Sequence, residues 1–167
     1  GAATVTVDSA AGIEEVAVGD GGADITATTI DLYPVNGIGA DGQLEVAGTT
    51  LTFDSTSGGE NFDIDNITAA GATLVSATLP VSGNITVDQS GGGSLTVTGV
   101  STVAGAIDIS VAGADLDNTG GSITASTGGG VGNISLDTTG SGDIILGTLT
   151  APGDTVTIVS AGSIDDD

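Results

Sequence analysis

The feature that most constrains this chain is a loose Gly-x-apolar-x-apolar unit that recurs along most of its length. Copies begin at Gly71, Gly83, Gly93, Gly105, Gly121, Gly132, Gly142, Gly153 and Gly162. Successive copies start 9 to 16 residues apart, so two copies span about 20 to 28 residues. A repeat of that length is typical of one coil of a β-solenoid, in which each coil buries its apolar side chains against neighbouring coils.

The segments between these glycines alternate apolar and polar residues with a period of two. Ile107, Ile109 and Val111, for example, alternate with Asp108 and Ser110. No segment sustains the apolar spacing of an amphipathic helix, and 30 glycines interrupt every long window. We therefore expect an all-β fold whose apolar side chains face a core and whose Thr, Ser and Asp side chains face water.

A β-solenoid suits the residue types available for the core. A narrow stacked core favours small and β-branched residues, and the only aromatic residues are Tyr33, Phe53 and Phe62. About eight coils, stacked about 4.8 Å apart, are expected. Short strands at this spacing also fit a β-sandwich or jelly roll, which stays the alternative. We expect a single all-β domain over 1–167, with regular repeats over 71–167 and a cap or longer loops over the less regular 1–70.

The composition excludes most binding and catalytic chemistry. The chain has 22 acidic residues and no Lys, Arg, His or Cys, which gives a formal net charge of −22. Without cationic side chains, binding to nucleic acid or to an anionic membrane surface is not expected. Without imidazole or thiol groups there is no ordinary general base near neutral pH and no thiolate nucleophile. We therefore expect a protein that is not an enzyme, and no segment is apolar enough to insert into a membrane.

The missing residue types also suggest where the protein works. A chain without Cys, Met, Trp, Lys or Arg suits a surface exposed to oxidants and trypsin-like proteases. We therefore expect a secreted protein at the cell surface. Because the chain has no Met, Gly1 is expected to come from a processed or longer protein.

The best acidic constellation lies between Glu60 and Asn66. On a strand, Asp63 and Asp65 would share one face, with Phe62 and Ile64 on the other. Two carboxylates on one face could bind Ca²⁺ through oxygen ligands or act as the acid/base pair of a glycosidase. They could equally form a solvated strand face. The scarcity of aromatic side chains, the usual sugar platforms, weighs against the glycosidase.

A second acidic segment contains Asp115 and Asp117, followed by Asn118. It is superficially similar to a calcium loop but has no Glu where an EF-hand needs one. A turn held by Asp and Asn side chains is the competing interpretation. The predicted metal ligands are thus Asp63, Asp65, Asp115 and Asp117, with Ca²⁺ as the only candidate cofactor.

Three segments match the acceptor pattern for N-glycosylation. They begin at Asn66, Asn84 and Asn133. Two of these asparagines directly follow a glycine that opens a repeat unit, where a turn favours Asn in any case. We therefore interpret them as turn residues.

Residues 132–164, which begin Gly-Asn-Ile-Ser-Leu-Asp and end Ser-Ala-Gly-Ser-Ile, resemble the repeat regions of filamentous-haemagglutinin-type bacterial adhesins. The closing residues 160–167 are similar to the junctions between such repeats. The resemblance holds from about Gly83 onward and is weak before it. It implies a right-handed parallel β-helix within a very large secreted surface protein.

These observations favour a structural segment of an extracellular adhesin or fibre. Its expected partners are neighbouring repeats or subunits of the same protein, and host or matrix surface ligands. One alternative is a pilin-like filament subunit completed by a donor strand such as Ala3–Val7. Another is a surface-layer module stabilised by Ca²⁺.

Overall fold

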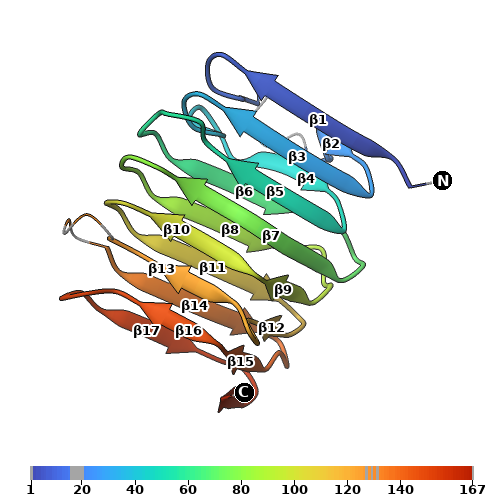
Figure 1. The fold of residues 1–167 in the computed structure, drawn as a ribbon. Helices are drawn as coiled ribbons and strands as arrows, with labels where there is room; N and C mark the ends of the chain where they lie inside the picture. The colour runs from blue at the N-terminus through green and yellow to red at the C-terminus, as the bar shows by residue number, and fades with distance from the viewer. Residues whose placement is uncertain (1, 16–20, 127, 129, 131, 167) are drawn as a thin grey trace.

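The computed structural model describes residues 2–15, 21–126, 128, 130 and 132–166. These residues form 18 β-strands and no helix, and the strands stack as a parallel β-solenoid of about seven turns (Figure 1). The predicted all-β solenoid is confirmed, and the β-sandwich alternative is not what the chain adopts. The expectation of about eight coils was one coil too many.

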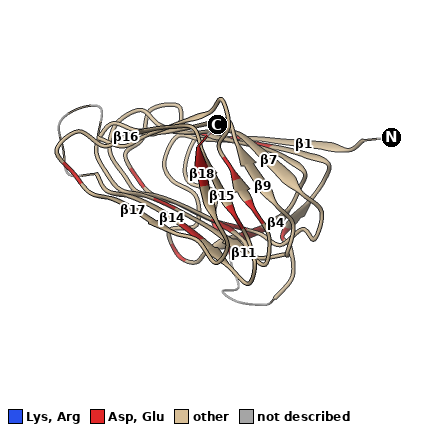
Figure 2. Cartoon of the chain, turned by 90° about the horizontal axis from the view of Figure 1, so that it is seen from below, with Lys and Arg blue, Asp and Glu red and all other residues tan. Residues whose placement is uncertain are grey.

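Two parallel sheets form the walls of the solenoid. The strands of sheet A are β1 (Thr4–Ser9), β3 (Thr29–Pro34), β5 (Thr50–Asp54), β7 (Ala72–Leu79), β9 (Leu95–Val97), β10 (Gly99–Thr102), β12 (Leu116–Asp117), β13 (Ser122–Thr124), β15 (Ile144–Leu146), β16 (Thr148–Thr150) and β18 (Ile164–Asp166). The strands of sheet B are β2 (Ile25–Thr26), β4 (Leu44–Ala47), β6 (Phe62–Asn66), β8 (Ile85–Gln89), β11 (Ile107–Ala112), β14 (Ile134–Thr139) and β17 (Val156–Val159). Viewed along the coil axis, β1 and β7 lie opposite β14 and β17 across a flattened cross-section (Figure 2).

The pairing register shows how long each coil is. Leu44 pairs with Ile64, 20 residues later, whereas Leu116 pairs with Ile144, 28 residues later. This range matches the spacing predicted from pairs of glycine-led units. In Figure 1 the front strands run to the left and the rear strands to the right as the chain descends from the N-terminus, which is a right-handed path.

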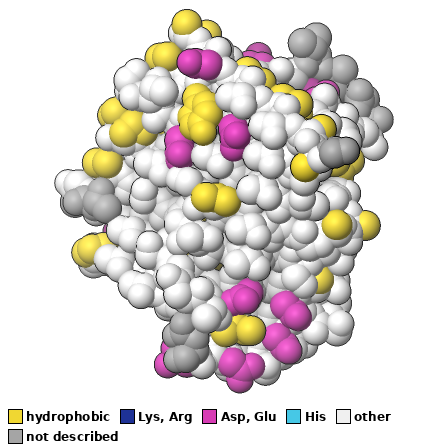
Figure 3. Space-filling model, turned by 45° about the vertical axis from the view of Figure 1, so that its right-hand side comes forward, with side chains coloured by type: hydrophobic (Ala, Val, Ile, Leu, Met, Phe, Trp, Pro, Cys, Tyr) yellow, Lys and Arg dark blue, Asp and Glu magenta, His cyan; other side chains and the backbone are white. Residues whose placement is uncertain are grey.

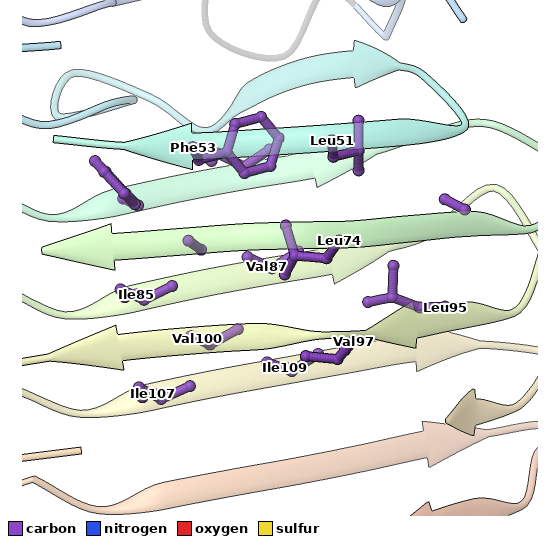
Figure 4. Packing of buried hydrophobic residues seen from close by; sticks show 14 of the residues in the cluster. Leu51, Phe53, Leu74, Ile85, Val87, Leu95, Val97, Val100, Ile107 and Ile109 are labelled. Carbon is purple, nitrogen blue, oxygen red and sulfur yellow. The ribbon is translucent and has the colours of Figure 1, made fainter. Parts of the chain in front are cut away.

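The core is made of apolar columns that run from coil to coil between the two sheets. Leu51 and Leu74 of sheet A pair in register, as do Val87 and Ile109 of sheet B, and all four are fully buried. Figure 4 shows these side chains projecting between the strands of the two layers. Alternation along each strand therefore places one set of side chains inside and the other on the surface, as the period of two predicts.

The shape of the coil changes along the axis at β7. This strand pairs with β5 on one side, and on the other side with both β9 and β10. From there on, sheet A contributes two short strands to each coil instead of one long strand. A bulge in the β5–β7 pairing, after Leu51, marks the same region.

Glycine is required where successive coils turn at the same corner. Gly83 has a φ of 140° and Gly105 a φ of 152°, values that L-residues rarely adopt. A Cβ atom on Gly105 would also lie 2.1 Å from the Gly83 carbonyl oxygen. The recurring glycines in the sequence thus mark corners at which one backbone passes directly over another.

Candidate functional site

The predicted ligands Asp63 and Asp65 lie on the outer face of sheet B, on strand β6. Phe62 and Ile64 alternate with them and are fully buried, whereas both aspartates are partly exposed. The predicted division of this segment into an acidic face and an apolar face is therefore confirmed. The alternation follows directly from the strand geometry.

One glutamine, Gln43, holds both Asp63 and Asp88, an aspartate from a later coil. The Gln43 side-chain nitrogen donates to Asp63 Oδ1 at 2.9 Å and to Asp88 Oδ2 at 2.8 Å. Ser110 Oγ donates to the other oxygen of Asp88. Burial raises the pKa of the Asp63 carboxyl above its ordinary value, the Gln43 hydrogen bond opposes this rise, and the Asp88 charge adds to it.

Asp65 belongs to a column of acids in three consecutive coils. Glu45 pairs with Asp65 in register, and Asp65 pairs with Asp88. Strands in a sheet lie about 4.8 Å apart, so like charges directly opposite one another repel and destabilise the sheet. Asp65 also accepts hydrogen bonds from the backbone nitrogen of Ser90 at 3.2 Å and from its hydroxyl at 2.7 Å.

Asp115 and Asp117 lie at a different place, around strand β12 of sheet A. Asp117 Oδ1 accepts a hydrogen bond from the Thr119 backbone nitrogen at 2.8 Å, which is the pattern of an Asx turn. Asp115 Oδ1 accepts one from the Asp143 backbone nitrogen, at 2.9 Å, in the next coil. The structure thus supports a turn held by side chains here and puts the two predicted acidic pairs on different sheets.

Another group of acids, which sequence reasoning missed, converges on one point. Glu15, Asp24 and Glu45 each place a carboxylate oxygen within 4.8 Å of the others. Glu15 is buried, Glu45 is partly buried and Asp24 is exposed, and the Asp24 backbone nitrogen donates to the Glu45 carbonyl oxygen at 2.8 Å. These are the only three His, Cys, Asp or Glu residues that meet in this way within the described part of the chain.

The electrostatics of this three-carboxylate cluster are unfavourable without a cation. Glu45 Oε2 is buried and accepts no hydrogen bond. The chain has no Lys, Arg or His that could neutralise the three carboxylates. Oxygen ligands of this kind are those that Ca²⁺ prefers. Two of the four glutamates in the sequence lie in this cluster, and their rarity was the signal that could have drawn attention to it.

The asparagines of the glycosylation patterns serve the backbone. Asn66 is fully buried, and its side chain exchanges two hydrogen bonds of 3.0 Å with the backbone of Gly48 and donates to Gln89 Oε1 at 2.7 Å. The side-chain oxygens of Asn84 and Asn133 each accept a backbone N–H from the next coil. These contacts support their interpretation as turn and corner residues.

The surface of the described residues has no pocket, and none of their segments forms a helix that could cross a membrane. Comparison of this chain with models of protein families, with curated proteins and with solved structures gives no match. The solenoid architecture implied by the adhesin-like repeats is present, whereas membership of that family stays an expectation.

Proposed function

We propose that this chain is a non-catalytic structural segment of an extracellular bacterial adhesin or fibre. The observation that carries the proposal is the continuous parallel ladder over about seven turns. Almost every strand between the two ends hydrogen-bonds to a strand of the preceding coil and to one of the following coil. A molecule built in this way acts as a stiff spacer, since no coil can be displaced without breaking two rows of backbone hydrogen bonds.

The surface chemistry supports a location outside the cell. Trypsin-like proteases cleave after Lys or Arg, and the chain has neither. It also lacks Cys and Met, the side chains that oxidants modify first. Acidic side chains on the outer face of sheet B keep the rod solvated and discourage association of solenoids side by side.

The acidic pair on β6 supports a structural role more than a catalytic one. Asp63 is held by Gln43, and Asp65 by Ser90. Both side chains therefore already serve contacts between coils. A glycosidase would need one of them to protonate a leaving group while a sugar is bound beside it.

Calcium is the cofactor that the chain could use, and the three-carboxylate cluster is the place where we propose that it binds. Residues from three successive parts of the chain, Glu15, Asp24 and Glu45, would supply the oxygens. The ion would tie the loop after Ile13 to the outer face of sheet B, which makes its role structural. No reaction step depends on it.

Surface exposure and rigidity are both testable on the intact protein. Antibodies raised against this chain should label intact source cells as strongly as permeabilised cells. The purified chain should resist proteinase K, which does not need Lys or Arg, for much longer than it does after denaturation in urea and dilution into the same protease. Labelling only after permeabilisation would contradict the extracellular location, and rapid digestion of the native chain would contradict the stiff spacer.

A further inference from the structure

The outer face of sheet A carries hydroxyl side chains that are aligned from coil to coil. One column consists of five threonines in five consecutive strands of sheet A, paired in register: Thr4, Thr29, Thr50, Thr73 and Thr96. A second column follows in the later coils: Thr78, Ser101, Thr124 and Thr150. We call these two columns the hydroxyl belt.

The belt repeats at distances that the backbone sets. Neighbouring strands lie about 4.8 Å apart, and residues two apart along a strand lie about 6.6 Å apart. Outward threonines such as Thr50 and Thr52 on β5 extend the array along the strand direction. Threonine is stiff at χ1 because of its branched Cβ, so its hydroxyl and methyl groups hold fixed positions. In Figure 1 the strands of sheet A run nearly parallel to one another from coil to coil.

The nine side chains of the belt are themselves uncharged, although the whole chain has a net charge of −22. In Figure 3 acidic side chains lie in the upper third and at the bottom of the face shown, and the region between them is mainly uncharged. Acids of the same outer face adjoin the belt: Asp31 pairs in register with Thr52, Asp54 with Thr78 and Asp117 with Thr96. The corresponding face of sheet B stacks Glu45, Asp65 and Asp88.

We propose that the hydroxyl belt binds ice. The ligand is crystalline water, which presents hydrogen-bonding oxygens in a regular lattice whose repeats are close to those of a flat parallel sheet. Hydroxyl groups in fixed positions can join that lattice, and the methyl groups between them fit its hollows. The belt side chains carry no charge, which suits this ligand because ice excludes ions, and the adjoining aspartates limit the contact area to the columns themselves. The binding uses many weak contacts at once. Because the coil stack is rigid, its side chains lose little conformational entropy when these contacts form.

This proposal goes beyond the structural role proposed above and does not depend on it. A stiff segment of an adhesin that bound ice would attach its cell to an ice surface. The extracellular location could be wrong while the purified chain still bound ice, and the reverse also holds. The two proposals therefore fail in separate experiments.

The test uses the purified chain and two matched substitutions. Thr73→Tyr places a large ring in the middle of the first column, and Thr86→Tyr makes the same change on the outer face of β8 in sheet B, where Thr86 is similarly half-buried. Each variant is measured for freezing-point hysteresis and for the fraction of protein taken up by a slowly growing ice hemisphere. We expect the original chain and Thr86→Tyr to show both effects, and Thr73→Tyr to fall to the level of a protein that does not bind ice.

A gentler variant guards against misfolding. Thr73→Val keeps the shape of the side chain and removes only the hydroxyl, and circular dichroism reports whether each variant retains its strands. We expect Thr73→Val, folded, to be taken up into ice less than the original chain. Two results would overturn the proposal: no hysteresis and no uptake by the original chain, or equal losses in Thr73→Tyr and Thr86→Tyr.

Discussion

The outer faces of the two sheets show what a parallel solenoid does to its side chains. Both faces cover the same kind of apolar column, and both have strands about 4.8 Å apart. On sheet B the register stacks Glu45, Asp65 and Asp88, whereas on sheet A it stacks Thr50, Thr73 and Thr96. The in-register pairing therefore stacks any residue type that recurs at the same position in successive coils. Stacked carboxylates repel one another, and stacked threonines form an ordered surface.

The largest expected effect tests whether the two sheets contribute equally to the core that they share. Leu74→Ala beneath sheet A and Ile109→Ala beneath sheet B should each lower the free energy of unfolding by about 2–5 kcal/mol, because both side chains are fully buried. Urea unfolding followed by circular dichroism measures this loss. The control is Val75→Ala, since Val75 is exposed at the bulge of β7 and its loss should cost less than about 0.5 kcal/mol. A loss confined to one variant would show that the two sheets contribute unequally to the shared core.

The next effect concerns Ca²⁺ binding at the three-carboxylate cluster, which includes Glu45 on strand β4 of sheet B. With Ca²⁺ at about 100 times its dissociation constant, binding to the native state alone would add about 2.7 kcal/mol to the stability. Glu45→Gln should abolish this gain, because Glu45 supplies one of the three converging carboxylates. Thermal melting in EDTA and then in Ca²⁺ measures the gain.

Asp137→Asn is the matched control for the calcium experiment. Asp137 lies on the same outer face, on β14, and is outside the three-carboxylate cluster. This variant should keep the full response to Ca²⁺. A melting temperature of the original chain that does not change between EDTA and Ca²⁺ would remove calcium from the proposed function.

A smaller effect should distinguish the acidic column of sheet B from the first threonine column of sheet A. Asp65→Asn removes the middle charge of the acidic column and keeps an oxygen that can accept from Ser90. We expect it to raise stability by about 0.2–1 kcal/mol at low ionic strength. The gain should shrink in 1 M NaCl, where charges are screened within about 3 Å.

Thr73→Asp makes the opposite change on sheet A. Its paired neighbours Thr50 and Thr96 carry no charge, so the new carboxylate faces no like charge directly opposite it. We expect a loss of at most about 0.5 kcal/mol. If Asp65→Asn proved destabilising at low salt, repulsion along the acidic column would not be the dominant effect there.

The smallest expected effect is a pH dependence of the folding stability, which comes from Asp63 on sheet B. Burial raises the pKa of Asp63 in the folded state above its ordinary value of 3.8, so the folded protein binds more protons than the unfolded chain between those two values. The contribution of Asp63 to stability should therefore increase as the pH falls from neutral through its folded-state pKa, and level off below about 3.8. Asp63→Asn should remove this increment from a series of urea midpoints between pH 7 and pH 4. An identical pH profile in the variant would contradict this assignment.

Much of the fold could be predicted because local patterns repeat. The alternation in Phe62–Asn66 is enough to put Asp63 and Asp65 on one face and Phe62 and Ile64 in the core. The corner glycines can likewise be recognised in the sequence, since glycine is the residue that tolerates the positive φ of Gly105. The three-carboxylate cluster was beyond such reasoning, because Glu15 and Asp24 lie in loops whose path no periodicity describes.

The sequence by itself determined which side chains face inward, how long a coil is and which chemistry is closed to a chain without Lys, Arg, His or Cys. These properties follow from the period of two, the glycine spacing and the composition, all of which are local. Only the tertiary structure decided which residues align between coils. Because coil length varies from 20 to 28 residues, the corner loops set the register. That register made one face a column of acids and the other a belt of threonines.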